Sequence, residues 1–195
     1  NSNVLFWNKP YTILEKDGVK IGVIGLHGVF AFDDTVSSSM RQGIEARDEV
    51  KYLQRYLDEL RGKVDITVAL MHEGFPARQS SIGNTDVKRA LDKDIQTAKQ
   101  VKGLDILITG HAHVGTPEPL KVGNTLVLST DSGGIDIGKL VLDMDLKKHH
   151  NKIKSFELKT LYADEWKPDP ATQSVIDSWN KQLSETVRQK VGETP

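Results

Sequence analysis

Three histidines follow two apolar segments of the sequence. His72 comes directly after DITVALM, while His111 and His113 follow LDILITG and are separated by Ala112 alone. Burying an imidazole without a hydrogen-bond partner is unfavourable, so two of them just beyond an apolar run require an explanation. Neutral imidazole is a common ligand of Zn, Mn and Fe. These three side chains are therefore the candidate metal ligands of the sequence.

The segments that precede the histidines have the length and composition of buried parallel strands. Residues 20–26, 65–71 and 104–109 are near-continuous apolar runs. The stretches between them are long enough for crossover connections, with helical periodicity expected over residues 44–61 and 86–101. This order predicts an α/β fold with a parallel sheet. Because ligands bind outside the carboxyl ends of such strands, the three imidazoles are expected at one edge.

The rest of the chain adds a hairpin, a second β region and a terminal helix. Residues 11–16 are an expected strand that ends at the Asp17-Gly18 turn, and residues 27–43 and 73–84 are expected loops. After His113 the pattern predicts strands only, over residues 125–130, 135–143 and 152–161. From Asp169 onward apolar residues recur at helical spacing: Val175, Ile176, Trp179, Leu183, Val187 and Val191.

The other candidate ligands have simpler interpretations. A single histidine after a strand is more often a hydrogen-bonded loop residue than a ligand. His27 also follows a strand and is a candidate for the same edge, but nothing pairs with it, so we assign it a structural role. His149 and His150 lie in the polar tract KKHHNK and are expected to be solvated turn residues, or else a weak adventitious metal site. The nearby carboxylates are expected to be loop or cap residues: Asp33, Asp34, Glu73, Asp131 and Asp136.

Composition excludes several classes of function. The chain of 195 residues has 26 Lys and Arg against 27 Asp and Glu, so there is no basic excess for polymeric nucleic acid. A small anionic substrate needs only local charge and stays possible. Cysteine is absent, which excludes thiol ligands and thiol nucleophiles. No apolar run approaches the roughly 20 residues of a transmembrane segment. Asn1 is not a start methionine, so we expect a processed or shortened chain.

Four segments together resemble a known family. They are PYTILEKDGVKIGVIGL, DITVALMHEG, KGLDILITGHAHVGTPEP and VGNTLVLSTDSGGIDIGKLVLDMD, which span most of residues 10–145. They resemble the calcineurin-like binuclear metallophosphoesterases, and more closely the 5'-nucleotidase branch. The resemblance implies a four-layer α/β/β/α sandwich and two divalent ions, Zn, Mn or Fe. It implies that His72 and His111 bind one metal and His113 the other, and that a metal-activated water attacks phosphorus in line.

The family's earlier ligand motifs do not occur in this sequence. They are an Asp-x-His, a bridging Asp and a Gly-Asn-His-Asp/Glu motif whose His is the usual general acid, so no catalytic residue is assigned here. By the resemblance, residues 1–163 are the C-terminal half of the phosphoesterase domain. Residues 164–195 are a linker helix toward an absent C-terminal nucleotide-binding domain. The missing N-terminal half of the same domain is then an expected partner.

The missing carboxylates affect metal binding. Two divalent ions about 3.5–4 Å apart repel each other, and a bridging carboxylate normally offsets that repulsion. Three neutral imidazoles carry no negative charge. We therefore expect this chain alone to bind at most one metal, weakly, and to hydrolyse little.

The expected function of the parent protein is metal-dependent hydrolysis of nucleotide phosphoesters, as in 5'-nucleotidases. Related enzyme alternatives are cyclic-nucleotide, nucleotide-sugar and sulfur-ester hydrolases. The alternative from another class is a non-catalytic truncated scaffold that binds proteins. Coding sequence upstream of Asn1 that contains the missing motifs favours the enzyme, and a start codon there favours the scaffold. The resemblance also implies a periplasmic, extracellular or cell-surface location.

Overall fold

The structure is a computed structural model that describes residues 9–75, 87–146, 150–183, 187, 190 and 192. The chain divides into two compact units, Asn1–Thr160 and Leu161–Pro195. Both sheets belong to the first unit. The second unit contains the terminal helix, so each unit is described by itself.

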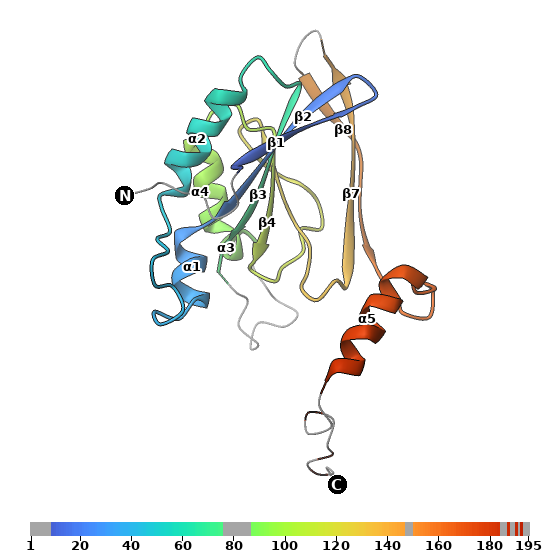
Figure 1. Ribbon diagram of the computed structural model, residues 1–195. Helices are drawn as coiled ribbons and strands as arrows, with labels where there is room; N and C mark the ends of the chain where they lie inside the picture. The colour runs from blue at the N-terminus through green and yellow to red at the C-terminus, as the bar shows by residue number, and fades with distance from the viewer. Residues whose placement is uncertain are drawn as a thin grey trace. The chain divides into compact units, whose positions relative to one another are not determined.

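A six-stranded sheet in the order β1-β2-β3-β4-β6-β5 forms the centre of the first unit (Figure 1). Its strands are β1 (Tyr11–Lys16), β2 (Val19–His27), β3 (Ile66–Glu73), β4 (Ile106–His111), β5 (Leu120–Val122) and β6 (Thr125–Ser129). Strands β2, β3, β4 and β6 run parallel, and β1 and β5 are antiparallel edge strands. Met71 pairs with Thr109 in the parallel β3–β4 ladder. The predicted parallel sheet is therefore confirmed.

Helices cover one face of this sheet. α2 (Glu49–Leu60) buries an apolar stripe against the strands, whereas the buried residues of α4 (Asp92–Gln100) are Asp94, Thr97 and Ala98. Leu53, Leu60 and Leu107 are completely buried in this core. Burial of side chains of this size stabilises the fold by roughly 1.5–3 kcal/mol each, and it fixes the strands whose ends carry the histidines.

A two-stranded antiparallel sheet packs on the opposite face. It consists of β7 (Asp136–Asp145) and β8 (His150–Thr160). Ile66, Ile106 and Leu128 of the large sheet form a buried cluster against which Leu140 and Phe156 pack. The described residues of this unit thus form three layers, α/β/β, and the predicted α/β fold with a second β region is confirmed.

Several predicted boundaries were wrong. The stretch predicted as loop from residue 27 contains α1 (Val29–Thr35), whose N-terminal amides meet carboxylates distant in sequence. α2 begins at Glu49 rather than residue 44, because the Asp48 carboxylate accepts a hydrogen bond from the Lys51 amide at 3.0 Å. The helix predicted from residue 86 is two pieces, α3 (Val87–Ala90) and α4.

The terminal helix α5 (Pro170–Gln182) makes up most of the second unit as described. It begins as the sequence predicts, with Asp169 accepting from the Thr172 amide at 2.8 Å and proline in the first turn. None of its residues is buried, and Trp179 is 66% exposed. Val191 lies outside the described residues. In the part of the chain that is described, no helix is long and apolar enough to cross a membrane.

Candidate metal centre at the carboxyl edge of the sheet

The strand register brings the histidines to one edge. In the β2–β3 ladder His27 is opposite His72, and in the β3–β4 ladder Glu73 is opposite His111. The ring centroids of His72 and His111 are 5.0 Å apart, and those of His27 and His72 are 5.3 Å apart. Imidazoles from three neighbouring parallel strands therefore lie side by side.

His111 is the most constrained of these residues. Its backbone has φ 71°, a left-handed conformation uncommon for a residue other than glycine. It is 7% exposed, and its buried Nε2 has no hydrogen-bond partner among the described residues. The Asp34 carboxylate, on α1, is 3.4 Å from Nε2, a contact without hydrogen-bond geometry. Because buried nitrogens are normally satisfied, the lone pair of an unpartnered Nε2 is available to an added ligand.

His113 also has a left-handed backbone conformation, with φ 53°, and its side chain is exposed. It is close enough to influence His72. The pKa of His72 is lowered, mainly because its own ring is partly buried. The neighbouring His111, His27 and His113 lower it further by charge repulsion. The neutral form of His72 is therefore favoured, and the neutral form is the one that binds metal.

Two neighbours of the site were not predicted as such. His27 follows a strand and was a candidate for the same edge, but it was assigned a structural role because nothing in the sequence pairs with it. Its ring adjoins that of His72, through the register of the β2–β3 ladder. Asp34 gave no comparable signal, because its approach to His111 depends on the unpredicted helix α1.

Two buried carboxyl groups lie beneath this edge. Glu73 is not a loop residue but the last residue of β3. It is fully buried and accepts a hydrogen bond from the Ala31 amide of α1 at 3.2 Å. Asp94 of α4 is also fully buried and accepts from the Thr109 hydroxyl. Burial raises the pKa of Glu73 and raises that of Asp94 to about 7, to which the nearby Glu73 contributes.

The side chains at this edge are suitable metal ligands by type, but those described do not form a complete site. The unpartnered Nε2 of His111, the adjacent His72 ring and the Asp34 carboxylate are donors that divalent transition metals accept. Within the described ranges no three His, Asp or Glu side chains are grouped closely enough to hold an ion. The remaining carboxylates named from sequence have other contacts or positions: Asp33 pairs with Arg41, Asp131 accepts from the Ser132 amide, and Asp136 begins β7.

The other two histidines lie in or beside a stretch outside the described residues. His149 lies outside the described residues, so its predicted turn position is not described. His150 was predicted in the same turn and is instead the first residue of β8, paired with Asp145.

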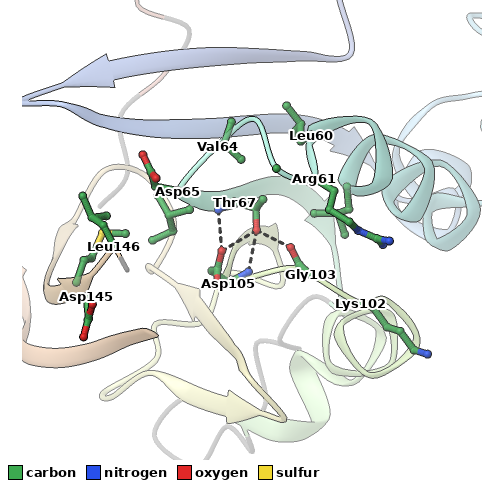
Figure 2. Close-up of a pocket in the computed structure, with 14 residues that line it drawn as sticks. Leu60, Arg61, Val64, Asp65, Thr67, Lys102, Gly103, Asp105, Asp145 and Leu146 are labelled. Carbon is green, nitrogen blue, oxygen red and sulfur yellow. Dashed lines mark hydrogen bonds between the residues drawn. The ribbon is translucent and has the colours of Figure 1, made fainter. Parts of the chain in front are cut away.

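A pocket of about 340 Å³ lies at the opposite edge of the sheet, where the parallel strands begin (Figure 2). Apolar side chains such as Leu60, Val64 and Met144 form part of its lining. Its polar groups are engaged in hydrogen bonds. The Asp105 carboxylate accepts from the Thr67 amide at 2.8 Å, and the Asp105 amide donates to the Thr67 hydroxyl at 3.0 Å.

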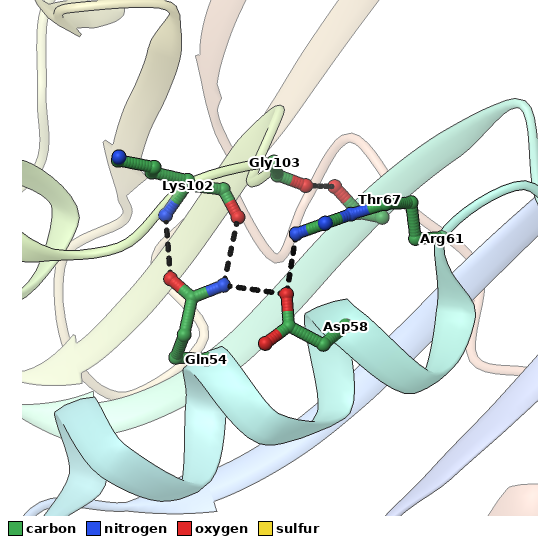
Figure 3. A network of polar contacts seen from close by, with 6 residues as sticks. All are labelled: Gln54, Asp58, Arg61, Thr67, Lys102 and Gly103. Carbon is green, nitrogen blue, oxygen red and sulfur yellow. Dashed lines mark hydrogen bonds and ion pairs between the residues drawn. The ribbon is translucent and has the colours of Figure 1, made fainter.

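A second network closes the rim of this pocket (Figure 3). The Gln54 side-chain oxygen accepts from the Lys102 amide at 2.7 Å, and its nitrogen donates to the Lys102 carbonyl at 3.3 Å. That nitrogen also donates to Asp58, which pairs with Arg61. These contacts join α2 to the segment before β4, so the polar groups at this edge have a structural role.

Comparison with known proteins identifies the relatives of this chain, although no protein-family model matches it. The chain is 28% identical over 191 residues to the trifunctional nucleotide phosphoesterase YfkN of Bacillus subtilis, covering 95% of this chain and 12% of that protein. It is 28% identical over 211 residues to a snake venom 5'-nucleotidase of Naja atra, covering 99% of this chain and 36% of the relative. The chain's relatives are nucleotide phosphoesterases.

A solved structure shares the fold of this chain. NAD nucleotidase (NadN) of Haemophilus influenzae superimposes with a TM-score of 0.66 at 18% identity, over 93% of this chain and 43% of that one. The resemblance to the 5'-nucleotidase branch of calcineurin-like phosphoesterases is thus confirmed. The chain spans only about a third or less of the length of the curated relatives named above.

Proposed function

We propose that this chain is part of a metal-dependent hydrolase of nucleotide phosphoesters. His72, His111 and His113 supply part of a two-metal site. The observation that carries the proposal is the meeting of His72 and His111 at the carboxyl edge, with the buried Nε2 of His111 lacking a hydrogen-bond partner among the described residues. The relatives support the reaction class, since they are named as 5'-nucleotidases or nucleotide phosphoesterases.

In this proposal the residues of this chain act as metal ligands. His111 presents Nε2 from a left-handed backbone conformation, and the lowered pKa of His72 favours its neutral form, which presents a lone pair. Asp34 contributes negative charge 3.4 Å from His111. When bound, Zn, Mn or Fe would polarise the phosphate oxygens and make a coordinated water acidic enough to react near neutral pH. The general acid and the bridging carboxylate are assigned to polypeptide that carries the missing motifs.

The terminal helix fits a longer protein. α5 exposes Val175, Ile176 and Trp179 at helical spacing. We assign this apolar stripe to contact with a C-terminal nucleotide-binding domain, in line with the greater length of the relatives. A periplasmic, extracellular or cell-surface location is part of the same proposal, because one relative is a venom protein.

A titration of this chain with Zn²⁺ and Mn²⁺ tests the proposal. Calorimetry should give at most one weak metal equivalent, and His111→Ala should abolish it. Adding a polypeptide that carries the Asp-x-His and Gly-Asn-His-Asp/Glu motifs should raise the stoichiometry to two and produce hydrolysis of AMP. Cyclic nucleotides, nucleotide sugars and thiosulfate esters assayed in parallel identify the substrate class. Two tight equivalents on this chain alone would contradict the proposed division of ligands.

The non-catalytic scaffold predicts a different outcome. A scaffold would gain no second metal equivalent when the complementing polypeptide is added, and complementation would restore no activity toward any of the four ester classes. The metal stoichiometry after complementation therefore distinguishes the two functions even before a substrate is found.

A further inference from the structure

The side chain of Asp94 contacts the strand that carries His111. Asp94 lies on α4 and is fully buried, and its Oδ1 accepts a hydrogen bond from the Thr109 hydroxyl. Thr109, itself 6% exposed, precedes His111 by two residues on β4. The Thr109 hydroxyl has one proton, and the next nearest acceptor, the Glu73 carbonyl, is at 3.4 Å. The carboxyl group of Asp94 is therefore the main hydrogen-bond partner of the Thr109 hydroxyl, in addition to the backbone pairing of β4 with β3 and β6.

The second oxygen of the same carboxyl group lies against the segment that follows His72. A Cβ added to Gly74 would lie 3.0 Å from Asp94 Oδ2 and 3.1 Å from the Cβ of Ala112. Gly74 has φ 114°, which other residues rarely adopt, and the next amide, that of Phe75, donates to the Ala90 carbonyl at 2.8 Å. The backbone after His72 is thus packed directly onto Asp94 and onto Ala112, the residue between His111 and His113.

One carboxyl group therefore contacts both chain segments that carry imidazoles. We propose that Asp94 is a positioning residue for this edge: through Thr109 and Gly74 it sets the separation and orientation of the His72 and His111 rings. Asp94 touches neither imidazole and acts through the backbone of β3 and β4. The proposal builds on the proposed function, because the ring separation of 5.0 Å matters for shared metal binding.

The cost of placing Asp94 here supports a role beyond packing. Its Oδ2 is buried without a hydrogen-bond partner in the described part of the chain, a state that normally destabilises a protein. Burial, together with the nearby Glu73 and Glu49, raises the pKa of Asp94. An apolar side chain would avoid this cost but could not accept the Thr109 hydrogen bond.

Imidazole NMR of the metal-free chain tests the proposal without any activity. Long-range ¹H–¹⁵N spectra report the ring environment and tautomer of His72 and His111. Asp94→Ala and Thr109→Val should shift both sets of signals and weaken Co²⁺ binding about tenfold, the lower end of the effect of losing a metal-site supporting residue. Thr109→Ser keeps the hydroxyl and should restore both properties.

Thr67→Val is the matched control. It removes a threonine hydroxyl of similar burial that is hydrogen-bonded at the other edge of the sheet, beside Asp105. It should lower stability yet leave the His72 and His111 signals unchanged. If Asp94→Ala fails to fold, Thr109→Val against Thr109→Ser decides the question.

Unchanged imidazole signals in a folded Thr109→Val protein would overturn the proposal. Absence of Co²⁺ binding in the wild-type chain would instead overturn the proposed metal function. The ring spectra without metal would still report whether Asp94 positions the imidazoles, so the two failures are distinguishable.

Discussion

The two edges of the parallel sheet differ in whether their polar groups have hydrogen-bond partners. At the edge where the strands begin, Thr67 and Asp105 hydrogen-bond to each other, and Gln54 hydrogen-bonds to the Lys102 backbone (Figures 2 and 3). At the edge where they end, His111 and His113 have left-handed backbones. In the described part of the chain, the buried side-chain atoms without hydrogen-bond partners are Glu73 Oε1, Asp94 Oδ2 and His111 Nε2, all at or beneath that second edge.

We interpret this contrast as a division of roles: the edge where the strands begin stabilises the fold, and the edge where they end is the proposed functional site. Polar groups with hydrogen-bond partners stabilise a fold. Strained backbone and unpartnered buried groups destabilise it, and they are concentrated at functional sites. Because the costly features gather around the histidines, we place the chemistry there and assign the pocket at the opposite edge to the structural side of the contrast. Each of the following predictions compares the two edges.

The largest expected effect is a pH dependence at the histidine edge. The pKa of Asp94 is raised from 3.8 to about 7, so the folded protein holds a proton that the unfolded chain releases between these values. Its contribution to stability is therefore lost as pH rises through that window, by up to roughly 4 kcal/mol. In Asp94→Asn the group cannot ionise, so the stability of this variant relative to wild type should increase from pH 4 to pH 8. Urea unfolding across this range measures it, and a difference that does not vary with pH would refute the assignment.

A smaller effect is expected at the opposite edge. Thr67→Val leaves the Gly103 carbonyl and the Asp105 amide without the hydroxyl they share, which should lower the free energy of unfolding by about 1–3 kcal/mol. This loss should be nearly independent of pH from 5 to 8, because a hydroxyl does not titrate there. Urea unfolding at the two pH values checks it. A loss that grows strongly with pH would show that the two edges are coupled.

The smallest effect is expected at the rim network. Gln54→Ala removes two hydrogen bonds to the Lys102 backbone, but water can replace them at this exposed position. We expect a loss of about 0.5–1.5 kcal/mol and no change in metal affinity. Thermal unfolding and a Zn²⁺ titration of the same preparation measure both quantities. Weaker Zn²⁺ binding by this variant would contradict the separation of the edges.

The parallel sheet was predictable because its signal is local. The runs that end at Leu26, Met71 and Thr109 have strand length and apolar composition, and simple rules of α/β folds then place the residues that follow at one edge. The juxtaposition of His72 and His111 follows from that topology. The amphipathic pattern of α2 was equally readable, although its first residue depends on the Asp48 cap.

What the sequence did not reveal depends on long-range contacts. The Ala31 amide of helix α1 donates a hydrogen bond to Glu73, which is 42 residues away in the sequence. The local sequence therefore gave no signal for this helix. Asp34 reaches His111 only through that helix, and Asp94 reaches Thr109 across the interface between α4 and β4. A buried aspartate on a helix looks like an exposed one until the packing is known.

The most direct test of the central claim is a Zn²⁺ titration of this chain followed by imidazole NMR. We predict that the His72 and His111 signals move together and saturate at no more than one equivalent, and that His111→Ala abolishes the response of His72. Movement of the His149 and His150 signals alone, or independent responses of His72 and His111, would contradict a shared metal centre at the carboxyl edge.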